Sequence, residues 1–516
     1  MGSPSQISIS STNASIVARL GAARIDGRSE NLRHRQDELR SLHEALSKAH
    51  EQLQAAMLAD TGHSAAEINL EFSMALQTVC HHYDSLDFRQ AQDEEYQVEQ
   101  GHDHTGRRMN VGVVYIRPSA LSSLFSVVAP LAAAMAAGNV LILEVLATLY
   151  QLPHLLSKVL VEALDADTFA IVSTPLSDEA LRYLSAHRVL TDLGRPADDT
   201  HANVLASCSG SRVIGVVDRT ADITQAAKAI VRARFAFQGK SVYAPDVILV
   251  NEFVKSSLLE SVVKEATVYL SQTPARNTEP AVLRQHAAVR KQMASIVAEN
   301  RGNIIALGEA AGIMDLASRR DAAILATKMT LPLLVFLSCT SLDDAINFAS
   351  CNSDDDLLVG TPYLASYVFG SPEVARYLSQ GLSACASFLN HIPVEILVYS
   401  SSGLVGPAGP AGHPLDAKHR YTKAMFEVPR PQFVANAHAG VPFKDAVVIN
   451  PAAAAKLLNS ALKPLKPTDQ PFQVSSIGFF EQGLLTSLAI AMTPVVVGIG
   501  YGMYLAGKWL LPYVRR

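Results

Sequence analysis

The chain has 516 residues, 18% of which are charged, and its net charge at pH 7 is −5. This length is enough for two or three packed domains, and the acidic balance excludes the basic surface typical of nucleic-acid-binding proteins. The five cysteines are scattered and form no CxxC pair, which argues against a disulfide framework and favours a reducing compartment.

The first residues, MGSPSQISISSTNAS, are polar and rich in serine. They contain no apolar core and so do not fit a secretory signal, and we expect residues 1–15 to be a disordered lead-in. Gly2 begins a partial match to a myristoylation motif, but the match fails at Gln6, where the motif needs Ser or Thr.

Helices and strands are expected to alternate through the next part of the chain. One set of apolar residues recurs at helical steps and predicts a single amphipathic helix: Leu32, Leu39, Leu42, Leu46, Ala49, Leu53 and Met57. The run NVGVVYI (110–116) then predicts a strand, LFSVVAPLAAAMAAGN (124–139) a helix, and VLILEV (140–145) a second strand. A strand–helix–strand unit of this length is typical of a parallel sheet.

Further apolar runs predict more strands: RVIGVVD, DVILVNE, NIIALGE, LPLLVFL and EILVYSS. Because most of them are separated by helical stretches, the predicted fold class is α/β with more than one sheet. The sequence contains no internal repeat of fixed period.

The C-terminal part has a different character. Residues 483–507 carry no charge, and their length is enough to cross the roughly 30 Å hydrocarbon core of a bilayer as a helix. Trp509, Tyr513 and the terminal arginines follow as interfacial anchors do. A buried core helix is the alternative, but the preceding Pro/Lys-rich segment fits a linker over 451–482. We therefore predict a C-terminal transmembrane anchor over 483–507.

Motifs that carry chemistry are scarce. The sequence contains no GxGxxG, GxxxxGK[ST], GxSxG or HExxH pattern. The Gly/Pro-rich run 403–413 lacks the backbone donors of a phosphate nest and is expected to be a mobile surface loop. The pairs His81/His82 and His102/His104 have no second ligand pair at metal-site spacing, so no metal site is predicted.

Several segments together resemble the aldehyde dehydrogenase superfamily, and most closely its short class with tail-anchored fatty aldehyde dehydrogenases. The segments are GAARIDGRSENLRHRQDELRSLHEAL, GVVYIRP…APLAAAMAAGN, GKSVYAPDVIL and LPLLVFLSCTSLDDAINF, and the resemblance covers about Ile16 to Phe433. It implies a Rossmann-like cofactor domain over 16–208 and an α/β catalytic domain over 209–410. It also implies that residues 411–450 return to the cofactor domain and supply bridging strands that mediate dimerisation.

The positions that carry catalysis in that family hold other residues here. The family's nucleophilic cysteine corresponds to Val242, which has no lone pair for attack on an aldehyde. The family's general-base glutamate lies 34 residues earlier, a spacing that falls on Cys208. Its oxyanion-stabilising asparagine corresponds to Leu121, which removes a side-chain donor.

The cofactor positions are also substituted. The family's adenosine-ribose lysine corresponds to Glu144, whose carboxylate would repel a 2′-phosphate, and the nicotinamide-ribose glutamate corresponds to Lys328. The segment between Val189 and Cys208 is several residues short, which trims the expected pyrophosphate site. We therefore expect no cofactor, or NAD if the protein is active.

The resemblance leaves more than one function open. We expect a membrane-anchored pseudoenzyme that binds a lipophilic aldehyde or acid, or acts as a scaffold or dimer partner. The alternative is an active NAD-dependent oxidoreductase that converts long-chain or polyketide-type aldehydes to acids, with Cys208 as a relocated nucleophile. A Schiff-base role for Lys240 is a further option, although an exposed structural lysine is expected there.

Partners and location follow from the same resemblance. We expect contact with a lipid bilayer through residues 483–507, and a homodimer or a heterodimer with a related protein. No nucleic-acid partner is expected. The folded part would face the cytosol at the endoplasmic reticulum or a related organelle membrane.

Overall fold

In a computed structural model of the chain, two compact units are present, Met1–Ala435 and Asn436–Arg516. The structure describes residues 11–119, 121–145, 150–190, 204–206, 212–271, 287, 290–291, 293–295, 302–308, 311–316, 328–351, 363–399, 421–430, 450–464 and 479–514. Cys208, residues 191–203 and 207 of the shortened segment before it, and the 403–413 run lie outside these residues.

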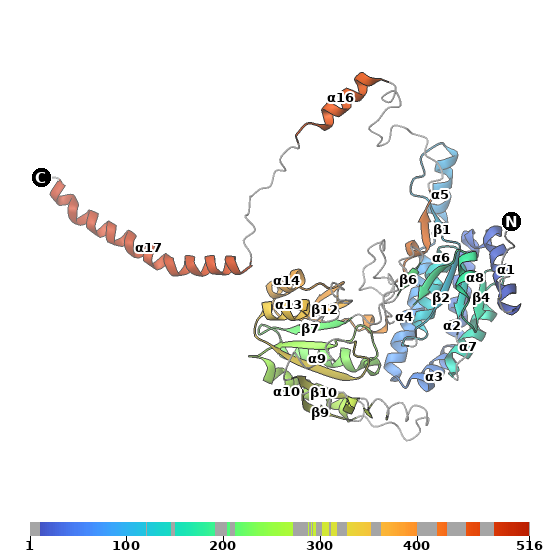
Figure 1. The fold of residues 1–516 in the computed structure, drawn as a ribbon, viewed down its shortest axis with the longest axis horizontal. Coiled ribbons are helices and arrows are strands. Elements are labelled where there is room, and N and C mark those ends of the chain that lie inside the picture. The colour runs from blue at the N-terminus through green and yellow to red at the C-terminus, as the bar shows by residue number, and fades with distance from the viewer. Residues whose placement is uncertain are drawn as a thin grey trace, which may run out of the picture. The chain divides into compact units, whose positions relative to one another are not determined.

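The first of two large sheets in the larger unit has five parallel strands (Figure 1). Its order is β4 (Phe169–Val172), β3 (Val140–Glu144), β2 (Val113–Arg117), β5 (His187–Leu190) and β6 (Val204–Ala206). Helix α6 (Phe125–Ala136) connects the parallel neighbours β2 and β3, so the predicted strand–helix–strand unit is confirmed.

Alternating side chains of this sheet enter two different cores. Val114 and Ile116 pack toward α2 (Leu32–Lys48), α4 (Ala65–Asp84) and α6, whereas Val113 and Tyr115 face α1 (Ser11–Asp26) and α8 (Asp178–Tyr183). A sheet covered on both faces needs apolar residues at every position, which explains the continuous apolar runs in the sequence.

The predicted single helix from Leu32 to Met57 is wrong in one respect. The structure divides it at Ala49 into α2 and α3 (His50–Thr61). The leucine pattern continues across the break, and Leu39 and Leu53 are both fully buried. Periodicity therefore identified the buried residues without revealing the interruption of the helix at a single residue.

The second large sheet has seven strands. Its order is β13 (Ser387–Leu389), β12 (Ala365–Phe369), β7 (Val213–Val217), β8 (Val247–Asn251), β11 (Leu333–Cys339), β10 (Gly312–Leu316) and β9 (Gly302–Leu307). Neighbours run parallel except β9 and β10. Helices α9 (Ile223–Phe235) and α10 (Lys255–Leu270) contribute to the core on one face, and α13 (Leu342–Cys351) and α14 (Pro372–Gly381) to that on the other.

The structure confirms the α/β class and most predicted strands. RVIGVVD and DVILVNE contain β7 and β8, and NIIALGE and LPLLVFL overlap β9 and β11. The strand predicted for EILVYSS is wrong, because Glu395–Val398 forms a 3₁₀ helix, η3, whose apolar side chains are buried. A short apolar run fits a buried helical turn as well as a strand, and periodicity does not separate the two.

A two-stranded antiparallel ribbon joins β1 (Arg108–Asn110) to β14 (Glu427–Pro429). Helix α5 (Phe88–Glu99) precedes β1 in the chain and has no buried residue. The turn η5 (Lys423–Phe426) leads into β14, and Phe426 is fully buried against the core. The ribbon thus pairs a segment near residue 110 with one near residue 428.

The smaller unit contains α16 (Pro451–Ala461) and α17 (Phe479–Val514). Within α17 the window Gln482–Met503 has a mean hydropathy of 1.9 and none of its described side chains is buried, so it is long and apolar enough to cross a membrane. The predicted span 483–507 lies inside α17. Helix α16 occupies part of the segment predicted to be a linker.

Candidate functional site

A strained loop connects α9 to β8 and carries Val242. Three successive residues, Phe237, Gln238 and Gly239, have left-handed φ angles of 50°, 56° and 71°. At Gly239 a Cβ atom would lie 2.7 Å from the backbone of Leu331, so only glycine fits. Non-glycine residues in this conformation each cost about 1–3 kcal/mol and need support from their surroundings.

The corner between α3 and α4 supplies that support. The backbone N–H of Phe237 donates to Glu67 Oε1 at 2.7 Å, and Gln238 Nε2 donates to the carbonyl of Thr61 at 3.0 Å. The His63 ring meets the Phe237 ring edge-on at 5.3 Å. Glu67 also closes a capping box with Ser64 at the start of α4. The Ser-x-x-Glu spacing in the sequence is the signal that could have identified Glu67.

Val242 lies in apolar surroundings on this loop. It is half-buried and packs against the large apolar cluster between the sheets, while Ser241 beside it is fully buried. The next residue, Tyr243, is fixed from two sides: its carbonyl accepts from Tyr367 Oη at 2.7 Å, and its ring meets the Tyr399 ring. These contacts give the loop a defined aromatic and aliphatic environment.

Tyr399 extends this environment toward the start of α6. Its ring stacks on that of Phe125 with centroids 5.7 Å apart. Leu121, just before α6, is half-buried and packs on the same apolar cluster, and its backbone N–H donates to Ser119 Oγ. The structure therefore places Val242 and Leu121 on one apolar cluster, and neither side chain has a polar atom.

A fully buried carboxylate lies at the start of α6. Glu71 accepts from the backbone N–H groups of Leu124 and Phe125 at 2.9 and 3.1 Å. Burial raises the pKa of this carboxyl to about 7, while the two backbone donors oppose the shift. Glu71 thus satisfies helix N–H groups that would otherwise be unpaired in the core.

Lys328 belongs to a buried ionic cluster behind the loop. Its Nζ donates to Asp246 Oδ2 at 2.9 Å and to the carbonyl of Ala244 at 3.1 Å. The same carboxylate accepts from the backbone N–H of Val213, and the guanidinium of Arg234 lies 3.7 Å away. Burial lowers the pKa of Lys328 to about 8, with Asp246 opposing the shift. Two cations therefore share one carboxylate.

Glu144 ends β3 and is 1% exposed. Its carboxylate accepts from the hydroxyl of Tyr115 and from Arg117 Nε, which lies 3.0 and 3.1 Å from the two oxygens. Burial and this hydrogen bond both raise the pKa of the Tyr115 phenol. The carboxylate is thus held by its neighbours on β2 and withdrawn from solvent.

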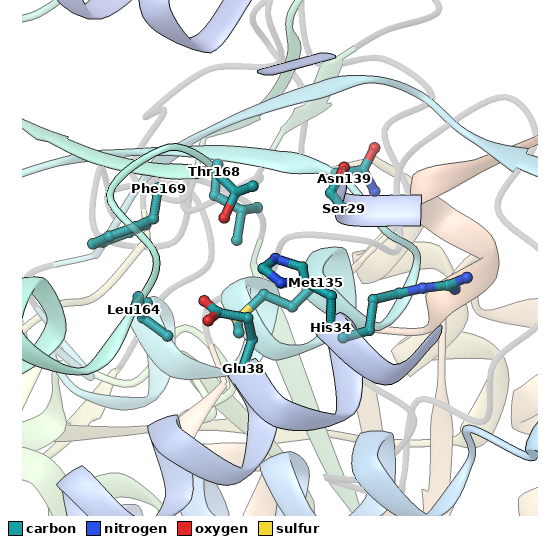
Figure 2. Close-up of a pocket in the computed structure, with 10 residues that line it drawn as sticks. Ser29, His34, Glu38, Met135, Asn139, Leu164, Thr168 and Phe169 are labelled. Atoms are coloured by element: carbon teal, nitrogen blue, oxygen red, sulfur yellow. The ribbon is translucent and has the colours of Figure 1, made fainter. Parts of the chain in front are cut away.

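A small hollow lies at the opposite end of the five-stranded sheet (Figure 2). Residues of α2, the end of α6 and the amino ends of β3 and β4 line it, including His34, Glu38, Met135 and Thr168. Its volume of about 20 Å³ is close to what one water needs. This hollow is too small for a nucleotide and lies away from the carboxyl ends, where ligands of open α/β sheets bind.

No group of three or more His, Cys, Asp and Glu side chains could hold a metal among the residues that the structure describes. His82 Nε2 lies 2.9 Å from the carbonyl of Tyr421 in the core, and His104 lies near Glu94. These contacts account for one member of each histidine pair noted in the sequence.

The comparisons with known proteins agree with this architecture. The model of the "Aldehyde dehydrogenase family" matches residues 15–353. No curated protein sequence matches the chain.

Solved structures share the fold at low sequence identity. AldH from Staphylococcus aureus, in a substrate-bound state, has a TM-score of 0.63 at 18% identity, with 87% of this chain and 99% of that one covered. The aldehyde dehydrogenase KauB from Pseudomonas aeruginosa has a TM-score of 0.63 at 16% identity, covering 82% and 89%. Glyceraldehyde-3-phosphate dehydrogenase GapN from Methanocaldococcus jannaschii, complexed with NADP, has a TM-score of 0.61 at 15% identity, covering 82% and 94%.

Proposed function

Because the chain belongs to the aldehyde dehydrogenase family, we propose that it is a membrane-anchored member that has lost hydride transfer and binds a lipophilic carbonyl compound. The observation that carries this proposal is Val242 in the loop before β8. The loop has a left-handed turn, a glycine that the turn requires and support from α4, and the residue at the expected nucleophile position is aliphatic.

The chemical consequence is direct. Oxidation through a covalent intermediate requires a nucleophile whose lone pair attacks the carbonyl carbon. Valine offers methyl groups only, and Leu121 offers no donor to the negative charge that would develop on the oxygen. Both side chains pack into the apolar cluster, as expected for a site that no longer stabilises a charged intermediate.

The described residues at the expected cofactor positions do not fit a dinucleotide. Glu144 is engaged by Tyr115 and Arg117, and Lys328 by Asp246, so neither charged group is available to a ribose. A carboxylate at the adenosine position would also repel a 2′-phosphate. This arrangement supports an absence of NADP and NAD binding, and we derive no step through either cofactor.

The ligand class is inferred from the side chains around the loop and from α17. Tyr399 contacts both Phe125 and Tyr243, all three rings are fully buried, and aromatic and aliphatic surroundings favour an apolar ligand. Insertion of α17 into a bilayer would hold the folded part where long-chain aldehydes and acids are concentrated. A homodimer or heterodimer at an endoplasmic reticulum or related membrane completes the proposal.

Purified full-length protein in detergent micelles tests it. We expect no NADH formation with decanal and either dinucleotide, and no saturable NAD binding by calorimetry. Decanal should nevertheless displace a fluorescent fatty-acid probe in the micromolar range. Empty micelles and the micelle-solubilised α17 peptide control for partition of the probe.

Turnover with NAD that is abolished by Cys208→Ala would overturn the proposal and favour the alternative of an active oxidoreductase. Absence of probe binding together with absence of turnover would instead exclude the ligand-binding part of the proposal. That result would leave a protein-interaction scaffold as the function to be tested.

A further inference from the structure

Helix α16, the shorter helix of the smaller unit, has 11 residues, and none of them is buried. Asn450 caps its start, because its side chain accepts from the backbone N–H groups of Ala452 and Ala453 at 3.0 and 3.3 Å. Isolated helices shorter than about 12–15 residues are marginal in water, even when they are rich in alanine. A cap alone does not change this, so α16 needs a surface that covers one of its faces.

The helix has an apolar face and a polar face. At about 100° per residue, the three leucines fall on the same side as three alanines. This apolar face consists of Ala453, Ala454, Leu457, Leu458, Ala461 and Leu462. The polar face opposite to it consists of Lys456, Asn459, Ser460 and Lys463. Leu458 and Leu462 are 60% and 69% exposed, so the apolar face is in contact with solvent.

The charged residues around α16 all have the same sign. Residues 451–468 contain Lys456, Lys463 and Lys466 and no Asp or Glu, whereas the whole chain has a net charge of −5. An apolar face opposite a lysine-bearing polar face is typical of helices that lie in the interface of a bilayer. Lysines at this depth are attracted to anionic lipid headgroups. Charge and polarity therefore favour a lipid surface as the partner of α16.

The position of α16 in the chain favours the same partner. Residues 465–478 connect it to α17, which contains the candidate membrane span. A chain of this length extends to at most about 50 Å, so insertion of α17 would keep α16 within reach of the bilayer surface. Binding of a tethered helix is intramolecular, with an effective concentration of roughly millimolar. A short helix that binds lipid weakly by itself can then remain docked.

We propose that α16 is an interfacial helix, which inserts its apolar face at the boundary of the acyl chains and directs its lysines to anionic headgroups. This inference rests on the membrane anchor of the proposed function. Without docking, residues 431–478 separate Arg430 of the larger unit from α17, whereas with docking only residues 431–449 separate it from the membrane surface. Docking of α16 thus keeps the larger unit close to the bilayer, where lipophilic ligands are concentrated.

Hydrogen exchange of the full-length protein in lipid nanodiscs, each holding one copy, tests the proposal. One set of discs contains phosphatidylcholine alone, and the other also contains phosphatidylserine. Peptide mass spectrometry follows the amides of α16 and α17. The α16 amides should be at least tenfold more protected in the discs with phosphatidylserine, because each lysine near an anionic surface contributes about fivefold to binding. Equal protection in both sets, or none in either, would contradict the proposal.

Two adjacent substitutions provide a matched pair on opposite faces. Leu458→Gln should lower the protection of α16 at least tenfold, because it removes a leucine from the apolar face. Asn459→Gln introduces the same residue on the polar face and should leave the protection unchanged within about twofold, since glutamine is a good helix former. Equal effects of the two substitutions would show that the apolar face does not bind lipid.

A third variant tests the charge. Lys456→Gln should lower the protection about fivefold in discs with phosphatidylserine and leave it unchanged in discs of phosphatidylcholine alone. Protection that does not depend on this lysine in either lipid would indicate that protein covers the apolar face, and would exclude an anionic surface as its partner.

The exchange of α17 separates this proposal from the anchor on which it rests. Slow exchange of α17 together with unprotected α16 would exclude the interfacial helix and leave the anchor intact. Rapid exchange throughout α17 would exclude the anchor and the interfacial helix with it. The proposed loss of hydride transfer would still be decided by NADH formation alone.

Discussion

Two ionic clusters of the larger unit, one around Asp246 and one around Glu144, differ in how they balance charge. Asp246 faces two cations, Arg234 and Lys328, in a fully buried setting behind the Val242 loop. Glu144 pairs with one cation, Arg117, whose side chain is 38% exposed. The first cluster holds a loop in place at a high desolvation cost, whereas the second closes the end of a sheet with a balanced pair.

The difference indicates which substitutions the fold tolerates. In the Asp246 cluster, one carboxylate oxygen also receives the backbone N–H of Val213, and the other receives that of Met329. Loss of this carboxylate would leave two buried cations without a counter-charge and two backbone N–H groups without their acceptor. In the Glu144 cluster, Arg117 can turn toward water. We therefore expect stability to depend far more on Asp246.

Asp246→Asn should have the largest effect. It leaves Arg234 and Lys328 without a counter-charge, and breaking a buried pair in this way costs about 3–5 kcal/mol of unfolding free energy. Urea denaturation of the full-length protein measures the loss. Asp178→Asn is the control, because Asp178 is 71% exposed beside Arg188 and should lose less than about 1 kcal/mol. Equal losses in the two variants would contradict the comparison.

The free energy of unfolding should depend on pH because Lys328 shares its counter-charge, Asp246, with Arg234. Lys328 has a pKa of about 8 in the folded protein, below its ordinary value of 10.5. Between these values the unfolded chain binds more protons than the folded one, so the free energy of unfolding should rise with pH, by on the order of 1–3 kcal/mol. Urea midpoints at several pH values, compared with Lys328→Met, measure it. An identical pH profile in the variant would show that Lys328 does not titrate there.

Glu144→Gln should cost less than Asp246→Asn. The amide oxygen still accepts from Tyr115, while the ion pair with Arg117 becomes a hydrogen bond from a cation to a neutral oxygen, for a loss of about 1–2 kcal/mol. A double-mutant cycle with Arg117→Met isolates the interaction between the two charges. A coupling as large as the Asp246→Asn loss would contradict the proposed difference between the clusters.

Ser64→Ala should have the smallest effect and tests the uncharged support of the loop. It removes the Ser64 hydroxyl, which accepts from the backbone N–H of Glu67 in the α4 capping box, and should lower the free energy of unfolding by about 1 kcal/mol. Ser177→Ala, which removes the cap of α8, is the matched control. If Glu67 also depends on Ser64 for its contact with Phe237, hydrogen exchange at the Phe237 amide should accelerate in the first variant only.

Much of the fold could be predicted from local pattern. Buried parallel strands such as β7, β8 and β11 are continuous apolar runs bounded by polar residues, and these were identified. The run EILVYSS has the same composition but folds as η3, because its apolar side chains enter the core from a helical turn. The break at Ala49 was missed for a similar reason, since a periodic apolar pattern continues across a one-residue interruption of the helix.

The sequence by itself determined the α/β class, the apolar C-terminal segment and the presence of an aliphatic residue at Val242, because these depend on composition, order and local spacing. Only the tertiary structure decided that Lys328 meets Asp246 and that Glu144 meets Arg117. Such pairings join elements far apart in the chain, and their energies depend on burial and on the neighbours that each strand and helix brings, which no local pattern contains.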